Sequence, residues 1–370
     1  MQVVFLVLSG LLLTACGGGS SSVAVDENGA VQAPSAAAAE DSAGDSDSDS
    51  DSETETETDS DADGDADSDG DTNSETATAA IDIYEKIFTA RSADCADYSD
   101  SYSASVRDLT RSQGFDSEVT VTADEGSCTI TSDNIPNHDF NDSSANFRAD
   151  VVKQSNQFVV SRRPLKATQN DASSAQMWDA VMLNGVVVDI KTGGCYYPSE
   201  RRADADGNTE AGCPNGGINW QLVALEYATK FGVDQHNAHV QPDSGSYHYH
   251  GDPNALFDDV PVGDGSPVIG FAADGFPIYG SYIFDQSTGA FRKATSGYTL
   301  RQGSRGTRSD SNPGGDFNGI YEQDWEWTDA GDLDECNGMT YQGQYGYYVT
   351  ESYPFMISCY VGTVSQTFRK

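Results

Sequence analysis

The sequence lacks basic residues over its first 80 positions, which contain no lysine and no arginine. Of its 59 acidic residues 19 lie in this stretch, so residues 81–370 keep 40 acidic against 20 basic residues, a net charge of −20. This acidic excess argues against nucleic acid or an anionic membrane face as a partner, because both repel it. It fits cation binding or a saline environment, which composition alone does not separate.

Long hydrophobic runs are also absent, and the run at residues 3–13 is too short for a permanent transmembrane helix. It has the length of a signal-peptide core and no lysine or arginine precedes it. It leads into Leu13-Thr14-Ala15-Cys16-Gly17, which resembles the lipobox of bacterial lipoproteins. We therefore expect residues 1–16 to be a lipoprotein signal with Cys16 lipidated. Gly17, in place of aspartate, favours the outer membrane, facing the periplasm or the cell surface. A plain secretory signal is the alternative.

Residues 17–80 contain no aromatic residue and consist largely of glycine, serine, alanine, threonine, aspartate and glutamate. Such a segment cannot bury enough apolar surface to fold. Repulsion between its carboxylates should keep it extended. We expect a disordered acidic tether between the lipid anchor and the folded part.

Cysteine is scarce, and its count fits an oxidising compartment. Seven cysteines less Cys16 leave six, an even number. Pairing of sequence neighbours predicts the disulfides Cys95–Cys128, Cys195–Cys213 and Cys336–Cys359, although six cysteines allow fifteen connectivities. Disulfides would leave nitrogen and oxygen atoms as the metal donors. Calcium is a candidate at the acidic segments 204–210 and 332–335, where a turn role is the alternative.

Long helical periodicity is rare, and short strands dominate the pattern. Residues 118–122 and 128–131 predict a hairpin in a small accessory unit, residues 81–130. Asn184-Gly185 between apolar runs predicts a second hairpin in a main domain, residues 131–370. One prominent helix is predicted over residues 220–231, capped by Asn219 and ended by Gly232. The fold class is therefore mainly β: a single principal domain plus a disulfide-bonded N-terminal hairpin unit.

Familiar catalytic motifs are missing. The chain has no Gly-x-Ser-x-Gly nucleophile elbow and no glycine-rich phosphate loop of Walker or Rossmann type. These absences argue against a serine hydrolase of that kind and against a nucleotide-binding enzyme.

Histidine is rare too, yet four of the five histidines fall within fifteen residues. In Ser246-Tyr247-His248-Tyr249-His250-Gly251, a β-strand would project His248 and His250 on one face and both tyrosines on the other. Two imidazoles at this spacing can reach one metal ion. The alternative is a set of exposed or hydrogen-bonded histidines without a ligand.

Several blocks together resemble the YHYH domain family, which is found in secreted and envelope proteins and has no assigned activity. They cover residues from about 128 to 362: Ile135-Pro136-Asn137-His138-Asp139, Asn237-Ala238-His239-Val240-Gln241-Pro242, Tyr247-His248-Tyr249-His250-Gly251, the segment 270–280 and the segment 332–338. The resemblance implies a candidate metal set of His138, His239, His248 and His250, because these four lie inside the blocks. His236 lies outside the pattern and is expected at the surface or at a helix exit, with a role as a fourth ligand as the alternative.

Three imidazoles and a water suit a catalytic zinc site, and four suit a closed one; imidazole also suits Cu(II). Asp139 and Asp274 are candidates for orienting an imidazole or activating a water, with a turn role as the alternative. The main hypothesis is an envelope lipoprotein that binds zinc or copper. The alternatives are a metal-dependent hydrolase and a metal-free module that binds a glycan, a peptide or another small molecule.

Overall fold

The computed structural model describes residues 79–213, 220–258 and 265–370. These residues belong to one compact unit that spans Ser74–Lys370. The predicted signal segment with Cys16, nearly all of the tether and the predicted cap Asn219 lie outside the described residues. Within the described residues, no helix has the length and apolar character needed to cross a membrane.

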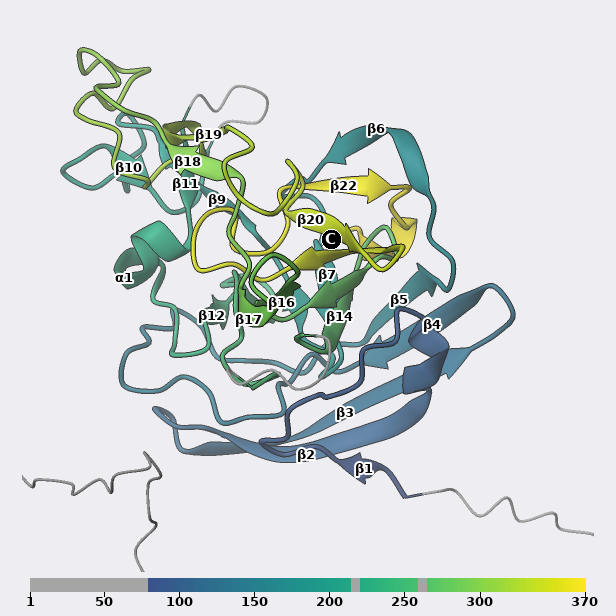
Figure 1. Cartoon of the computed structure of the whole chain (residues 1–370). Coiled ribbons are helices and arrows are strands. Elements are labelled where there is room, and N and C mark those ends of the chain that lie inside the picture. The colour runs from purple at the N-terminus through teal and green to yellow at the C-terminus, as the bar shows by residue number, and fades with distance from the viewer. Residues whose placement is uncertain (1–78, 214–219, 259–264) are drawn as a thin grey trace, which may run out of the picture. The chain divides into compact units, whose positions relative to one another are not determined.

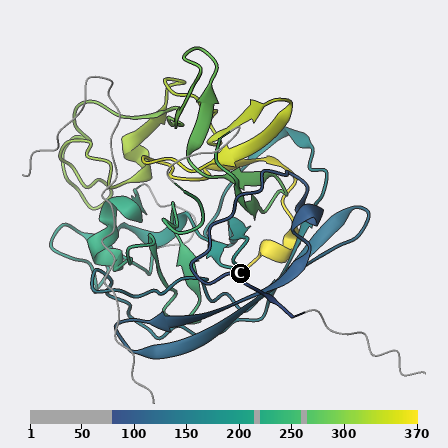
Figure 2. The same ribbon diagram turned by 60° about the horizontal axis from the view of Figure 1, so that its bottom comes forward.

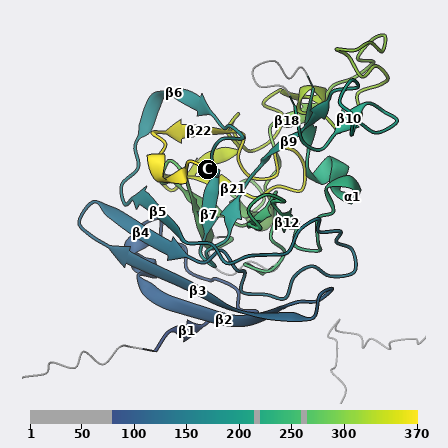
Figure 3. The ribbon, with the colours of Figure 1, turned by 180° about the vertical axis from the view of Figure 1, so that it is seen from behind.

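A five-stranded sheet forms one side of this unit, shown in blue in Figure 1 and seen again from other directions in Figure 2 and Figure 3. Burial alternates along its strands, so one face packs inward and the other meets solvent. The antiparallel pairing of β3 with β4 confirms the predicted hairpin. The sheet runs past residue 130, because β5 pairs with β4. In spatial order its strands are β1 (Ile81–Asp82), β2 (Asp100–Asp108), β3 (Gln113–Ala123), β4 (Ser127–Ser132) and β5 (Asn156–Ser161).

An eight-stranded mixed sheet forms the centre of the unit. Its middle strands are buried along their whole length, as expected for strands covered on both faces. Asn184-Gly185 makes the predicted turn between β7 and β8, with Gly185 at φ 84°. In spatial order the strands are β12 (Ala238–Val240), β13 (Tyr247–Tyr249), β8 (Val187–Val188), β7 (Ala180–Met182), β14 (Val268–Ala272), β15 (Pro277–Tyr279), β21 (Gln344–Tyr348) and β20 (Gly338–Tyr341).

Smaller sheets and short helices complete the fold. A three-stranded sheet has the order β10 (Asn208–Thr209), β9 (Lys191–Tyr196), β11 (Gln221–Val223). The pairs are β16 (Tyr282–Asp285) with β17 (Ala290–Lys293), β18 (Tyr298–Leu300) with β19 (Trp325–Trp327), and β22 (Cys359–Gly362) with β6 (Lys166–Ala172). The helical turns are η1 (Cys95–Tyr98), η2 (Leu225–Tyr227), α1 (Ala228–Phe231), η3 (Glu322–Asp324) and η4 (Gln366–Phe368).

The predicted helix over residues 220–231 is wrong in its first half. Residues Gln221–Val223 form β11, and helical structure begins only at Leu225. The Thr192 hydroxyl donates to the Leu222 carbonyl at 2.8 Å, which draws this segment to β9 instead of into a helix. Gly232 ends the helix as predicted, with φ 71°. Pairing with β9 has overridden the helical pattern of the local sequence.

One apolar core joins the sheets. Val119 and Phe158 of the five-stranded sheet belong to the same buried cluster as Phe271 and Ile278 of the central sheet. All three predicted disulfides are confirmed: Cys95–Cys128, Cys195–Cys213 and Cys336–Cys359. The second of them closes the loop that carries β10, near the site described next.

Candidate metal centre

Three histidines converge on one face at the β12 edge of the central sheet. His239 of β12 pairs directly with His248 of β13, and His250 follows two residues later on the same face. Their ring centroids form a nearly equilateral triangle with sides of 4.7, 4.8 and 4.8 Å. Each residue offers a ligand atom within 4.8 Å of the other two. This arrangement confirms that the two histidines of the His-x-His motif share a face, opposite to the two tyrosines.

Main-chain carbonyls orient two of these rings. His239 Nδ1 lies 2.8 Å from the Phe231 carbonyl, and His248 Nδ1 lies 3.1 Å from the Ser246 carbonyl. A carbonyl only accepts, so each Nδ1 carries the proton and each Nε2 presents a lone pair. Metal-binding histidines commonly use such a partner on the second nitrogen.

His250 completes the triad with a different environment. Its Nε2 lies 3.0 Å from His239 Nε2, and its buried Nδ1 has no hydrogen-bond partner. Burial lowers the pKa of all three imidazoles below the ordinary histidine value. They are therefore neutral at neutral pH, which is the form that binds a metal.

The geometry of the three nitrogens fits a divalent transition metal. Zinc holds imidazole nitrogens at about 2.0–2.1 Å, which places neighbouring ligand nitrogens about 3.3 Å apart in a tetrahedral site. The 3.0 Å separation of His250 Nε2 and His239 Nε2 and the 4.8 Å limit for the set require only small ring movements. A donor set of three imidazoles suits zinc or copper and not calcium.

A cavity of about 560 Å³ reaches the triad, a volume that holds a small molecule. A ligand from solvent can therefore approach a metal ion held by the three histidines. Among the other residues that line the cavity are Phe147, Arg148, Asp189, Thr192, Arg202, Glu210 and Phe231.

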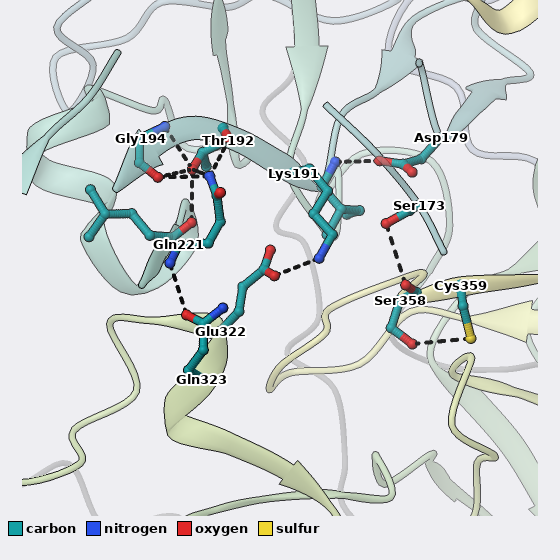
Figure 4. Close-up of polar contacts among 12 residues, drawn as sticks. Ser173, Asp179, Lys191, Thr192, Gly194, Gln221, Glu322, Gln323, Ser358 and Cys359 are labelled. Atoms are coloured by element: carbon teal, nitrogen blue, oxygen red, sulfur yellow. Dashed lines mark hydrogen bonds and ion pairs between the residues drawn. The ribbon is translucent and has the colours of Figure 1, made fainter. Parts of the chain in front are cut away.

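Strand β9 forms one wall of this cavity and is held by side-chain contacts (Figure 4). The Gln221 amide donates to the carbonyls of Thr192 and Gly194, the latter at 2.7 Å. Lys191 forms an ion pair with Glu322, with 2.5 Å between nitrogen and oxygen. These contacts tie the wall to segments that follow it by 27 to 131 residues in the sequence.

The structure does not bring His138 to the other three histidines, which corrects the predicted set of four. His138 lies on the tyrosine side of β13, with Nε2 2.7 Å from the Tyr249 hydroxyl and Nδ1 2.9 Å from the Asp139 carbonyl. The Asp139 carbonyl only accepts, so His138 Nδ1 carries the proton and Nε2 accepts from the Tyr249 hydroxyl. That hydroxyl itself accepts from the Asn184 amide at 2.9 Å. Both ring nitrogens are thus occupied. His236, expected at the surface, is buried and stacks on His138 with ring centroids 3.7 Å apart.

The two aspartates predicted near the metal have structural contacts elsewhere. The Asp139 carboxylate accepts from the Arg107 main-chain N–H at 2.8 Å. Asp274 accepts from the Tyr347 hydroxyl at 2.7 Å and the Gly362 main chain at 2.9 Å. Neither is among the residues that line the triad cavity. The turn role, which the sequence left open, describes Asp274, because its carboxylate also accepts from the Phe276 main-chain N–H at 3.4 Å.

The acidic segments predicted as calcium candidates also form turns. Asp204 accepts the main-chain N–H groups of Asp206 and Asn208, each at 2.9 Å. Asp334 accepts the main-chain N–H groups of Cys336 and Gly338, each at 3.0 Å. Asp332 forms an ion pair with Arg292 at 2.6 Å. Among the described residues, neither segment gathers three acidic or histidine ligand atoms within 4.8 Å.

Sequence reasoning missed Asp189, which is buried at the triad cavity. Its position depends on β8 lying parallel to β13, a pairing between segments some 60 residues apart. The only local signal is its place one residue after the apolar strand that follows Asn184-Gly185.

The fold and the site define a mainly β, disulfide-linked protein with a three-histidine cluster at a cavity. A family model described as YHYH protein matches residues 157–362, more than half of the chain, so the chain belongs to the YHYH family. The matched segment contains the three clustered histidines and begins after His138. Neither the curated proteins nor the solved structures yielded a match.

Proposed function

We propose that this protein is an envelope-anchored lipoprotein whose YHYH domain binds zinc or copper through His239, His248 and His250. The observation that carries the metal proposal is the nearly equilateral triangle of rings, two of them oriented by main-chain carbonyls. Hydrogen-bonded core histidines have no need to converge on one point, whereas metal ligands do.

The envelope part of the proposal rests on other features. Cys16 in its lipobox-like setting supports a lipid anchor in the outer membrane. The three disulfides support an oxidising compartment. The acidic segment between Cys16 and the first strand supports a spacer that carries the domain away from the membrane.

Elemental analysis of the full chain, purified without chelator or nickel resin, tests the metal proposal. We expect about one equivalent of zinc or copper, lost in the His248→Ala, His250→Ala double variant. His138→Gln is the matched control, because it removes an imidazole outside the triad and should keep the metal. Absence of metal from the wild type, even after incubation with zinc or copper, would reject the site. It would favour a metal-free binding module.

The second candidate function is a metal-dependent hydrolase, and the cavity at the triad favours it. A metal ion there would polarise a substrate carbonyl or phosphoryl group and lower the pKa of a bound water. A cobalt-substituted protein separates the candidates. A visible spectrum that changes on addition of acetohydroxamate indicates an exchangeable ligand position, as a hydrolase needs, and an unchanged spectrum indicates a closed carrier or structural site.

A further inference from the structure

Two buried polar atoms beside the triad have no hydrogen-bond partner: His250 Nδ1 and Asp189 Oδ1. The two residues are 3% and 4% exposed and line the same cavity. Buried polar atoms in native proteins are nearly always bonded, and two orphans at one place call for an explanation. One is a ring nitrogen that can donate, and the other is a carboxylate oxygen that accepts.

The strand register places these residues side by side. Val187 and Val188 of β8 pair in parallel with His248 and Tyr249 of β13. The ladder continues, because the Asp189 main-chain N–H donates to the Tyr249 carbonyl at 2.9 Å. Paired residues on neighbouring strands project from the same face of a sheet. Asp189 therefore lies next to His250 on the metal-binding face.

Lys370 bonds to one oxygen of the Asp189 carboxylate, Oδ2, and leaves the other oxygen, Oδ1, without a partner. Its ammonium group bonds to Asp189 Oδ2 and to the Ala175 carbonyl, the latter at 3.2 Å. The same group lies 4.5 Å from the centroid of the Trp178 ring, which lies 5.9 Å from the His248 ring. Asp189 is thus held in place by a lysine that packs on the Trp178 ring beside His248.

In the absence of a metal, the contact between His239 Nε2 and His250 Nε2 shows which nitrogen of His250 carries the proton. His239 Nε2 has no proton, because His239 Nδ1 donates to Phe231. The 3.0 Å contact with His250 Nε2 then requires a proton on His250 Nε2. That nitrogen cannot bind a metal while it is protonated, and a neutral imidazole that frees Nε2 carries its proton on Nδ1.

We propose that Asp189 is the positioning residue of the third metal ligand, accepting a hydrogen bond from His250 Nδ1 when the metal binds. Metal binding then changes the His250 tautomer. One proton leaves Nε2 for solvent and one is taken up at Nδ1, so His250 releases none overall. His239 and His248 use main-chain carbonyls for the same purpose. Burial lowers the His250 pKa, and the Asp189 main chain, which also acts on the His250 ring as an acceptor, raises it. The unpartnered Asp189 Oδ1 is the acceptor that we assign to Nδ1. The inference rests on the proposed metal function.

Nitrogen NMR of the full chain labelled at histidine, with and without zinc ion, tests the tautomer. We expect the His250 proton on Nε2 without zinc and on Nδ1 with zinc, whereas His239 and His248 keep theirs on Nδ1. A wild-type protein that binds zinc while the His250 proton stays on one nitrogen in both states overturns the inference and leaves the metal function standing. A wild-type protein that binds neither zinc nor copper overturns both the inference and the metal function.

The variant Asp189→Asn tests the partner. The introduced side-chain amide would turn its carbonyl oxygen toward Lys370 and its N–H group toward His250 Nδ1. A donor at that position favours the His250 tautomer with its proton on Nε2, which cannot bind the metal. We expect zinc affinity to fall about 10- to 100-fold, the range for loss of such a partner. Asp243→Asn makes the same charge change at an exposed position on the same cavity and should leave affinity within about threefold. Equal affinities in the two variants, with the Asp189→Asn fold intact, would overturn the role of Asp189.

Discussion

His239 and His248 lie directly opposite each other across β12 and β13, with their ring centroids 4.7 Å apart on one face of the sheet. On the other face of β13, Tyr247 and Tyr249 are fully buried and their hydroxyls bond to Asp234 and His138. One three-residue strand thus separates a candidate metal site from a structural hydrogen-bond network. The two faces should respond independently to substitution.

Tyr249→Phe should destabilise the fold and spare the metal. It removes the hydroxyl that bonds both His138 and Asn184, which leaves His138 Nε2 without a partner and the Asn184 amide with only the Asn137 side chain as acceptor. We expect the free energy of unfolding to fall by about 1–3 kcal/mol, measured by urea denaturation, with metal content unchanged. Tyr341→Phe, at a partly exposed hydroxyl with one contact at 3.3 Å, should cost less than about 0.5 kcal/mol. Loss of metal from Tyr249→Phe with full stability would contradict the separation.

His138 should make stability depend on pH on the acid side. Burial, and then the charge of His236, lower the pKa of His138 to about 3, against about 6.5 when unfolded. Between these values the unfolded chain binds a proton that the folded chain does not, so stability falls as the pH falls. We expect His138 to account for a loss of roughly 2 kcal/mol between about pH 6 and pH 4. Urea denaturation at several pH values should give a shallower dependence for His138→Gln, and an equal dependence would count against this account.

Much of the fold follows from local signals. Residues 118–122 and 128–131 predict the hairpin of β3 and β4, and Asn184-Gly185 predicts the turn between β7 and β8 because glycine takes the positive φ that this turn requires. The span 220–231 shows the limit. Its apolar spacing is helical, but partners more than 25 residues away in β9 decide its conformation.

In the candidate site too, local signals predict some of the residues and long-range packing places the others. The strand period places His248 and His250 together, and pairing of β12 with β13 adds His239. His138 lies in a family-like block just as they do, yet it packs against the tyrosine face of β13. Which face a distant segment meets depends on the assembled sheets, and no spacing in the sequence encodes it. For the same reason, the sequence does not indicate that Asp189 lies at the site.

Gly185 and Gly343 allow steric crowding to be separated from backbone strain. Both have φ 84°, but a Cβ at Gly185 would lie 2.5 Å from a Val119 methyl group, whereas one at Gly343 would meet nothing within 4 Å. We expect Gly343→Ala to cost about 1 kcal/mol from its left-handed backbone alone. Gly185→Ala should cost at least about 2 kcal/mol more, because the side chains of Val119 on β3 and Ser132 on β4 must move. Thermal denaturation of both variants would measure the difference, and equal losses would show that these side chains yield freely.

Removing the disulfide Cys195–Cys213 should weaken the fold without emptying the triad. The bond closes a loop with a sequence separation of 18 residues, and its entropic effect is about 3 kcal/mol. The Cys195→Ser, Cys213→Ser variant should show this loss in urea denaturation and keep its metal, since none of the three histidines lies in the loop. Loss of metal at full stability would show that the loop shapes the site.

The position of β12 at the edge of the central sheet has a consequence for the proposed metal site. Within the described residues β12 pairs in that sheet only with β13, so it is among the strands most able to fray. An ion shared by His239, His248 and His250 would have to leave before β12 could separate. Fraying and ion release would then be one event, and the concentration of free metal would set how often this edge opens. The supply of metal would then determine how much of the time β12 is ordered.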